Sequence, residues 1–238
     1  MLRSWIYTIM FLAWTLAVAV LATPALITQA GALGTARFWA RGVKALARVI
    51  AGISYRAEGH EHIPEGPCLI AAQHQSSFET YMLFLEVKKP VFVLKRELAW
   101  IPFVGWYIQR AGLVPINRGA GAAAMRKTLR AADAAFARGD QVVIFPEGTR
   151  TAPGRRREYR PGVFGIYHHC KVAVVPMALN AGYYWGKTRV RKDPGTIVFR
   201  FLPAIAPGLD KDAFMATLRR DIETAAATLP RLETQPTY

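Results

Sequence analysis

A histidine and a glutamate five residues apart are the first side chains in this sequence that could perform acid–base chemistry. His74 and Glu79 follow an apolar run, Cys68–Ala72, that is typical of a buried strand. If His74 ends the strand and Glu79 opens the next helix, the carboxylate can hold one imidazole nitrogen and leave the other to take a proton from a hydroxyl. A structural interpretation also exists, because Ser76 and Glu79 have the spacing of a helix capping box.

A second group of polar residues, Phe145–Arg150, follows another apolar run. Its Pro-Glu-Gly turn would bring together a carboxylate, backbone amides, a hydroxyl and a guanidinium, from Glu147, Gly148, Thr149 and Arg150. Such a group suits a phosphate monoester, which arginine can bind through two parallel hydrogen bonds. Taken alone, the segment could equally be an ordinary turn.

Two further basic residues stand at the ends of predicted strands. Lys95 begins a Lys-Arg-Glu-Leu segment, and Arg118 ends the segment Gly112–Arg118. Both could add positive charge to the same cleft. Because the chain contains 31 lysines and arginines, they could also be scattered surface residues.

The elements that must position these side chains alternate between strands and helices, which predicts an α/β fold with a layered mixed sheet flanked by helices. The predicted strands are Cys68–Ala72, Pro90–Leu94, Gly112–Ile116, Gln141–Phe145, Val172–Leu179 and Thr196–Leu202. The clearest helices are Ala122–Arg138 and Asp212–Thr228. We expect membrane-anchoring helices in residues 1–54, a catalytic domain in residues 55–229 and a tail in residues 230–238.

The amino-terminal part of the chain is typical of a membrane anchor. No charged residue occurs between Ser4 and Ala36, and Ile6–Leu26 is long enough as a helix to cross a hydrocarbon core of ~30 Å. A cleaved signal peptide is the alternative. Four positive charges follow the apolar run and one precedes it, which favours a cytoplasmic location for the domain that follows.

The next segment has the pattern of an amphipathic helix. Basic residues form one face, and apolar residues from Trp39 to Ile53 form the other. The basic residues are Arg37, Arg41, Lys44 and Arg48. This helix is expected either to lie in an anionic membrane surface or to pack on the globular domain with its basic face in solvent.

The remaining composition excludes several classes of protein. A formal net charge of +15 is compatible with nucleic acid, membranes or phosphorylated small molecules, but no nucleic-acid-binding module is recognisable, so no nucleic-acid partner is expected. Two cysteines are too few for a disulfide framework. His168, His169 and Cys170 offer adjacent metal donors, but no partner occurs at ligand spacing, so no metal site is expected.

With these groups of residues identified, the sequence resembles the glycerolipid acyltransferases of the lysophosphatidic acid acyltransferase family. Four blocks match in order across residues 55–205. The first is His74 and Glu79; the second is Lys95, Glu97, Leu98, Ile101, Pro102, Gly105, Gly112 and Arg118; the third is Phe145–Arg150; the fourth is Val175–Leu179. One block would be weak evidence, whereas four in the right order are specific.

The resemblance implies transfer of a fatty acyl group from acyl-CoA or acyl carrier protein to the sn-2 hydroxyl of 1-acyl-sn-glycerol-3-phosphate, which gives phosphatidic acid. It implies His74 as the general base, supported by Glu79, with direct attack on the thioester. It also implies that Glu147, Gly148, Thr149 and Arg150 bind the acceptor's phosphate region with help from Arg118. Lys95 or nearby amides would stabilise the oxyanion, and Val175 and Pro176 would shape the pocket wall.

No cofactor is expected beyond the acyl donor. The expected partners are membrane lipids, including lysophosphatidic acid, and the expected location is the cell inner membrane with the catalytic domain facing the cytoplasm.

The sequence departs from the family pattern at one position. Most members carry aspartate where this chain has Glu79, and the extra methylene could shift the carboxylate away from His74. The acceptor could therefore be another lipid, such as a lyso-ornithine lipid, or glycerol-3-phosphate. A membrane-tethered lipid-binding protein without catalytic activity is the alternative of another class.

Overall fold

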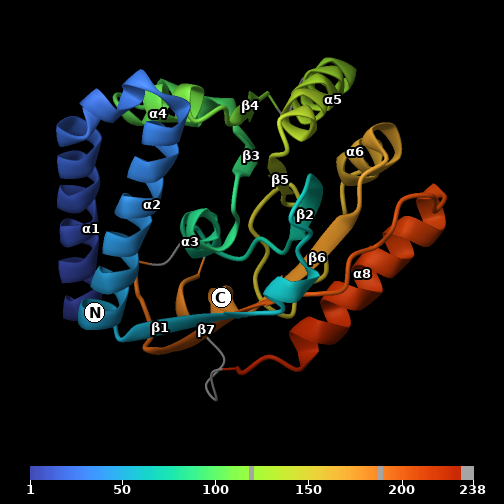
Figure 1. The fold of residues 1–238 in the computed structure, drawn as a ribbon. Helices are drawn as coiled ribbons and strands as arrows, with labels where there is room; N and C mark the ends of the chain where they lie inside the picture. The colour runs from blue at the N-terminus through green and yellow to red at the C-terminus, as the bar shows by residue number, and fades with distance from the viewer. Residues whose placement is uncertain (118–120, 187–189, 232–238) are drawn as a thin grey trace.

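A seven-stranded mixed sheet forms the centre of the molecule (Figure 1). The computed structural model describes residues 1–117, 121–186 and 190–231. The strands lie in the order β1-β7-β6-β2-β5-β3-β4. Their bounds are β1 Ile53–Glu58, β2 Cys68–Ala72, β3 Pro90–Lys95, β4 Val114–Ile116, β5 Gln141–Ile144, β6 Val174–Leu179 and β7 Gly195–Phe201. All neighbouring pairs are parallel except β6 and β7.

Helices cover both faces of the sheet. On one face lie α1 Leu2–Leu21, α2 Gln29–Leu46 and α3 Phe78–Glu86, which pack against alternate strand residues such as Ile70, Val143 and Phe199. On the other face lie α5 Gly121–Ala137, α6 Gly162–Cys170 and α8 Lys211–Ala227. The short helices α4 Val104–Arg110 and α7 Ala181–Tyr184 complete the fold. The α/β layered sheet expected from the sequence is confirmed.

The strand predictions were correct in place, and one strand was missed. Each of the six expected strands is present, with boundaries that differ by at most two residues. The missed strand, β1, pairs with β7 at the edge of the sheet. It carries the charged residues Arg56 and Glu58, which interrupt its apolar character. The predicted boundary between anchor and catalytic domain, between residues 54 and 55, falls inside β1.

The first two helices form an antiparallel hairpin (Figure 1). A turn at Thr23–Ile27 reverses the chain, and Trp14 Nε1 then donates a 3.0 Å hydrogen bond to the carbonyl of Trp39. At the other end of the hairpin, Arg3 Nε donates to the carbonyl of Ile50 at 2.9 Å. Gly42 allows α2 to approach α1 closely, because a Cβ there would lie 2.3 Å from the Trp14 ring.

This hairpin changes how the charge asymmetry must be interpreted. The rule that positive flanks face the cytoplasm assumes that the two flanks of an apolar helix lie on opposite sides of the membrane. Here Arg3, which precedes the apolar run, lies beside Ile50, which follows it. The two flanks are therefore at the same end of the hairpin, and counting their charges does not determine the orientation.

The predicted amphipathic helix packs on the domain rather than presenting its apolar face to a membrane. Val43 and Ala47 are buried in the core that includes α3. Arg37 donates hydrogen bonds to the carbonyls of Phe84 and Lys88, at the end of α3. Arg41 and Arg48 remain exposed. Of the two arrangements expected for this helix, the structure therefore adopts the one in which it packs on the globular domain with its basic face in solvent.

Candidate active site

His74 and Glu79 are in direct contact just beyond the carboxyl end of β2. The Nδ1–H group of His74 donates a 2.8 Å hydrogen bond to Glu79 Oε1. Glu79 is fully buried, whereas the imidazole is 12% exposed. Because Nδ1 carries the proton of this bond, Nε2 of a neutral imidazole has a lone pair that can accept a proton.

Glu79 also holds the turn between the strand and α3. Its Oε1 accepts 2.8 Å hydrogen bonds from the backbone amides of Gln75 and Ser76, while Ser76 Oγ accepts one from the Phe78 amide. The bonds at Ser76 have the character of a capping box, so the structural interpretation of this spacing is realised together with the contact between Glu79 and His74. The longer side chain of glutamate reaches the imidazole without loss of contact.

The Phe145–Arg150 segment lies against His74. The register of β2 and β5 pairs Ala71 with Ile144, so the residues that follow these two strands also run side by side. The Phe145 ring stacks on the imidazole with a centroid separation of 4.1 Å and an angle of 20°. The His74 amide donates a 3.4 Å hydrogen bond to Glu147 Oε1, so the two predicted groups form one site.

The turn itself requires glycine, and it contains a carboxyl group whose pKa is raised. Gly148 has φ +68°, and a Cβ there would lie 3.2 Å from Arg160 Cγ. Glu147 is 5% exposed, and burial, together with the charge of Glu79, raises the pKa of Glu147 to about 7. Thr149 and Arg150 are partly exposed. The segment therefore presents a hydroxyl and a guanidinium at the surface above a buried carboxyl.

Arg150 is linked to the His74–Glu79 pair through α3. Burial raises the pKa of the Tyr81 hydroxyl, the Arg150 guanidinium lowers it, and Glu79 raises it. Both charged groups therefore act on a hydroxyl two residues beyond Glu79. Arg150 also directly precedes Thr151, whose backbone amide donates a hydrogen bond to the His74 carbonyl, so this positive charge lies on a segment in contact with the histidine.

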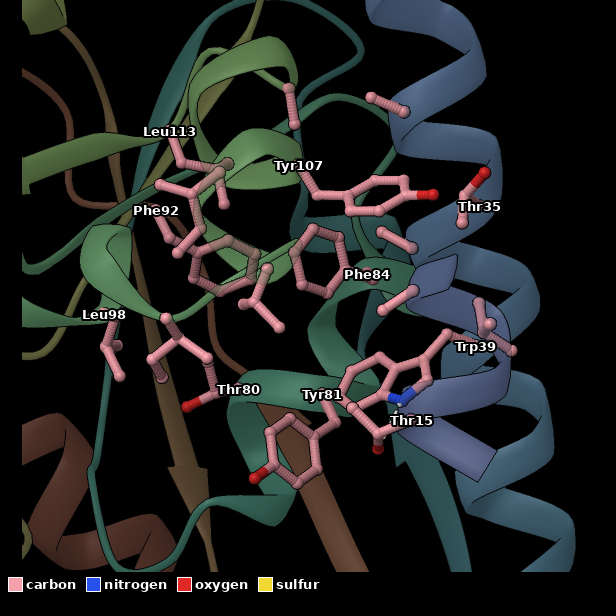
Figure 2. Close-up of a pocket in the computed structure, with 18 of the residues that line it drawn as sticks. Thr15, Thr35, Trp39, Thr80, Tyr81, Phe84, Phe92, Leu98, Tyr107 and Leu113 are labelled. Atoms are coloured by element: carbon pink, nitrogen blue, oxygen red, sulfur yellow. Dashed lines mark hydrogen bonds between the residues drawn. The ribbon is translucent and has the colours of Figure 1, made fainter. Parts of the chain in front are cut away.

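Tyr81 also lines a large apolar cavity of about 310 Å³ between the hairpin and the sheet (Figure 2). Figure 2 shows Thr80 and Tyr81 at one end of the cavity and Thr35 and Tyr107 at the other. Its other walls include Phe11, Trp39, Phe84, Phe92, Leu98 and Ile101. Thr80 and Tyr81 follow Glu79 in α3, so one end of the cavity begins beside the His74–Glu79 pair. Its shape and lining suit a hydrocarbon chain.

The second predicted block contains a charged residue, Lys95, and apolar residues that line the cavity. Lys95 lies at the end of β3, and its Nζ is 3.6 Å from Glu97 Oε1. Leu98 and Ile101 line the cavity. Gly105 allows the chain to pass close to Ala99, since a Cβ would lie 2.1 Å from that carbonyl oxygen. The described contacts of Lys95 do not include His74, and Arg118 lies outside the described residues.

The fourth predicted block lies inside the sheet. Val175 and Pro176 are buried in β6, where they pair with Ile70 and Ala71 of β2. Neither lines the apolar cavity. Their contact is with β2, the strand that leads to His74.

Several residues at the site gave no recognisable signal in the sequence. Tyr81 and Trp39 reach the cavity only because α2 and α3 pack together. Gln75 fixes the neighbouring segment: its Nε2 donates to the Leu179 carbonyl at 3.0 Å, and its Oε1 accepts from the Gly182 amide at 2.9 Å. Glutamine is too common a residue type for its position beside His74 to indicate this role.

The match to a family model decides the family. The model described as Acyltransferase matches residues 54–180, which include His74, Glu79 and Phe145–Arg150. The chain belongs to this acyltransferase family.

Several relatives of this acyltransferase have been named. A 1-acyl-sn-glycerol-3-phosphate acyltransferase of Pseudomonas aeruginosa is 38% identical over 167 residues, which cover 70% of this chain and 65% of that protein. The alpha form of Mus musculus is 28% identical over 171 residues, which cover 70% of this chain and 60% of that protein. The acyltransferase therefore spans less than two thirds of the length of these curated relatives.

A solved structure shares the fold of this acyltransferase. The crystal structure of the 1-acyl-sn-glycerophosphate (LPA) acyltransferase PlsC from Thermotoga maritima matches it with a TM-score of 0.80. The match covers 95% of both chains at 19% identity. Nearly the whole chain thus has a counterpart with the same fold.

Proposed function

We propose that this acyltransferase moves a fatty acyl group from acyl-CoA or acyl carrier protein to the sn-2 hydroxyl of 1-acyl-sn-glycerol-3-phosphate, giving phosphatidic acid. The observation that carries the proposal is the 2.8 Å contact of His74 with Glu79 beside the Phe145–Arg150 segment. The relatives named as 1-acyl-sn-glycerol-3-phosphate acyltransferases support this choice of acceptor.

In the proposed mechanism, His74 Nε2 accepts the proton of the acceptor hydroxyl as its oxygen attacks the thioester carbonyl. Buried Glu79 stabilises the imidazolium and holds the ring in place. The C–S bond then breaks, and the thiolate leaves and recovers the proton from His74. Lys95 or nearby backbone amides stabilise the oxyanion.

The acceptor's phosphate binds at Thr149 and Arg150, with Arg118 contributing a second positive charge. The partial exposure of Thr149 and Arg150 supports this role, because a lipid headgroup can reach them. An acyl chain occupies the cavity that begins at Tyr81. The thioester carbonyl then lies between the cavity and His74, where the hydroxyl can reach it.

The helical hairpin holds the enzyme in one leaflet of the membrane. Among the described residues, α1 is the one helix long and apolar enough to cross a membrane, and only 22% of its 18-residue apolar window is buried in the protein. Exposed apolar side chains along α1 include Trp5, Ile9, Leu12 and Leu16. Since the chain returns along α2, the hairpin can enter a leaflet without carrying the chain to the other side. The inner membrane, with the catalytic domain in the cytoplasm, is the proposed location.

The test is an assay of the purified protein with lysophosphatidic acid and acyl-CoA, with products identified by mass spectrometry. His74→Ala should lower kcat by about 10²- to 10⁴-fold, the usual contribution of a general base. His60→Ala is a matched control, because His60 also contacts a glutamate, Glu86 at 2.6 Å, but lies outside the site. Absence of transfer by the wild type, or full activity of His74→Ala, would refute the proposal.

An acceptor panel distinguishes the alternatives. Glycerol-3-phosphate and lyso-ornithine lipid are assayed beside lysophosphatidic acid, with wild type and Arg150→Ala. Arg150→Ala should raise the KM for any acceptor that carries a phosphate, whereas the KM for an ornithine lipid should change little. Lipid binding without turnover would indicate a non-catalytic protein.

A further inference from the structure

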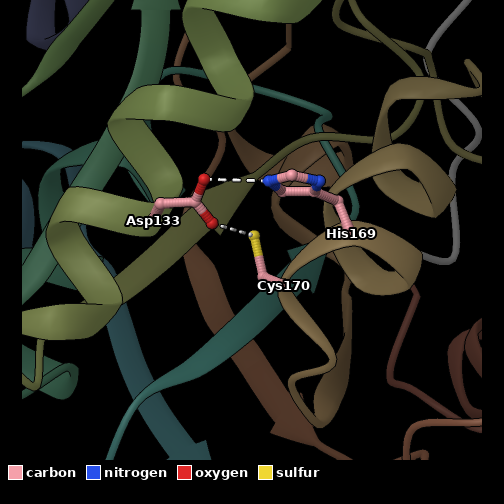
Figure 3. A group of neighbouring side chains, drawn as sticks. All are labelled: Asp133, His169 and Cys170. Atoms are coloured by element: carbon pink, nitrogen blue, oxygen red, sulfur yellow. Dashed lines mark hydrogen bonds and ion pairs between the residues drawn. The ribbon is translucent and has the colours of Figure 1, made fainter.

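Asp133, His169 and Cys170 form a compact group that the acyl-transfer reaction does not use. Asp133 lies on α5, whereas His169 and Cys170 form the end of α6 (Figure 3). His169 Nε2 is 2.8 Å from Asp133 Oδ2, and Cys170 Sγ donates a 3.3 Å hydrogen bond to Asp133 Oδ1. The metal donors His169 and Cys170, for which the sequence suggested no partner, therefore have one that is 36 residues away.

We propose that Asp133, His169 and Cys170 bind a zinc ion. An imidazole nitrogen, a thiolate sulfur and a carboxylate oxygen are the three ligand types that Zn²⁺ accepts in proteins. The three ligand atoms all lie within 4.8 Å of one another. Water completes the tetrahedron at the exposed side.

The three side chains must rotate to accommodate the ion. Zinc–ligand bonds of about 2.0–2.3 Å place tetrahedral neighbours about 3.3–3.6 Å apart. His169 Nε2 is 2.8 Å from Asp133 Oδ2, and Cys170 Sγ is 3.3 Å from Asp133 Oδ1, so the carboxylate must turn to bring one oxygen to the ion. The three ligand atoms, which lie within 4.8 Å of one another, must then move to this tetrahedral spacing. Asp133 and His169 are 50% and 49% exposed, which leaves their side chains room to rotate and gives the ion access.

The helices that carry the ligands are already held together. Gly165 of α6 packs against Met125 of α5, where a Cβ would lie 3.2 Å from the Met125 sulfur. Ala132 and Ile166 are buried in the shared core. Since the backbones are fixed by this packing, the ion has to order only three side chains.

The zinc site lies at the opposite edge of the sheet from His74. The catalytic residues follow the carboxyl ends of β2 and β5. Helices α5 and α6 run back to the amino ends of β5 and β6, and Asp133 and Cys170 lie toward the ends of these helices. The ion is therefore structural and does not contact the substrate. It links the helix after β4 to the helix that follows the Phe145–Arg150 segment.

The first experiment titrates metal-free protein with Co²⁺ as a spectroscopic substitute for zinc. The wild type should show a sulfur-to-cobalt charge-transfer band and the visible bands of a tetrahedral ion, and Zn²⁺ should abolish both. Cys170→Ser should lose the charge-transfer band although Cys68 remains. His168→Gln is the matched control and should behave as the wild type. A wild type without the band, or a band that persists in Cys170→Ser, would overturn the proposal.

The second experiment measures thermal unfolding with and without Zn²⁺. At a free Zn²⁺ concentration one hundred times Kd, the wild-type Tm should rise by about 5 °C. Asp133→Asn, His169→Gln and Cys170→Ser should each lose most of this rise. An equal rise in the wild type and in all three variants would place the zinc elsewhere and contradict the assignment. Neither experiment depends on the acyl-transfer assay.

Discussion

The backbone amide of Thr151 donates a 2.7 Å hydrogen bond to the backbone carbonyl of His74. This bond connects the residue after the Phe145–Arg150 segment to the histidine that we propose as the general base. Continued past the strand ends, the register of β2 and β5, which pairs Cys68 with Gln141 and Ala71 with Ile144, places His74 opposite Glu147. Thr151 lies beyond this register, because the chain turns at Gly148 before it returns to His74. Strand pairing and the Thr151 bond together hold the Phe145–Arg150 segment against His74.

The length of the Glu79 side chain should be critical for activity. One oxygen of Glu79 accepts hydrogen bonds from His74 Nδ1 and from the amides of Gln75 and Ser76 at 2.8 Å each. Glu79→Asp withdraws the carboxylate by about one C–C bond, roughly 1.5 Å. We expect kcat for acyl transfer to fall at least about tenfold and Tm to fall as well.

Glu79→Gln separates charge from length in the same assay. The amide keeps the reach of the side chain but does not stabilise an imidazolium, so kcat should fall by about 10²- to 10⁴-fold. Glu86→Gln, which changes the partner of His60, is the control. Unchanged kcat in both Glu79 variants would mean that the carboxylate has only its structural role at the start of α3.

Glu147 should make the stability of the protein depend on pH. Burial raises the pKa of Glu147 from 4.5 to about 7 in the folded state. Between these values the native protein binds more protons than the unfolded chain. The free energy of unfolding therefore falls as pH rises through this window and levels off above it.

Glu147→Gln removes the titrating group and should flatten this dependence. Between pH 5 and pH 8, the wild type should lose on the order of 2 kcal/mol relative to the variant. Denaturant unfolding in a mild detergent measures the difference. Glu61→Gln, at an exposed position, is the control and should follow the wild type. Parallel profiles for wild type and Glu147→Gln would contradict the raised pKa.

Local spacing predicted the features that depend on nearby residues. His74 and Glu79 are five residues apart, so a strand end and a helix start are enough to bring them together. The same holds for the turn at Gly148. The α/β class followed from the alternation of apolar runs with helical patterns, because strands and helices differ in their period.

Features made by distant segments could not be predicted in this way. An amphipathic pattern in residues 37–53 shows that one face is apolar, but not whether a membrane or α3 covers it. The cavity at Tyr81 needs four helices and a strand to assemble. The approach of Asp133 to Cys170 depends on the packing of α5 on α6, for which their spacing in the sequence gives no signal.

Charges on the outer face of α1 should release the protein from membranes. Ile9 and Leu16 are 63% and 61% exposed and lie two helical turns apart on the same side. A lysine in the hydrocarbon costs about 2.5–3.5 kcal/mol at the centre of a spanning helix, and somewhat less near the interface. The double variant Ile9→Lys, Leu16→Lys should therefore remain largely in the soluble fraction in flotation with anionic lipid vesicles.

A lysine elsewhere on the surface provides the control. Leu209 is also an exposed leucine, but it lies outside the hairpin, next to α8. Leu209→Lys should float with the vesicles as the wild type does. If the hairpin variant also floats undiminished, membrane attachment depends on another surface of the protein.

The far end of the apolar cavity should determine which acyl chains are accepted. Thr35 lies opposite Tyr107 at the end away from Tyr81 (Figure 2), and it is 9% exposed. Thr35→Phe fills this end and displaces the last methylene groups of a long chain. Because each buried methylene contributes about 0.8 kcal/mol, displacing two of them should lower kcat/KM for octadecanoyl relative to dodecanoyl donors by about tenfold. Thr35→Ala, which leaves the space open, should keep or lengthen the preferred chain. If Thr35→Phe folds and shows the wild-type preference, the chain must lie outside this cavity.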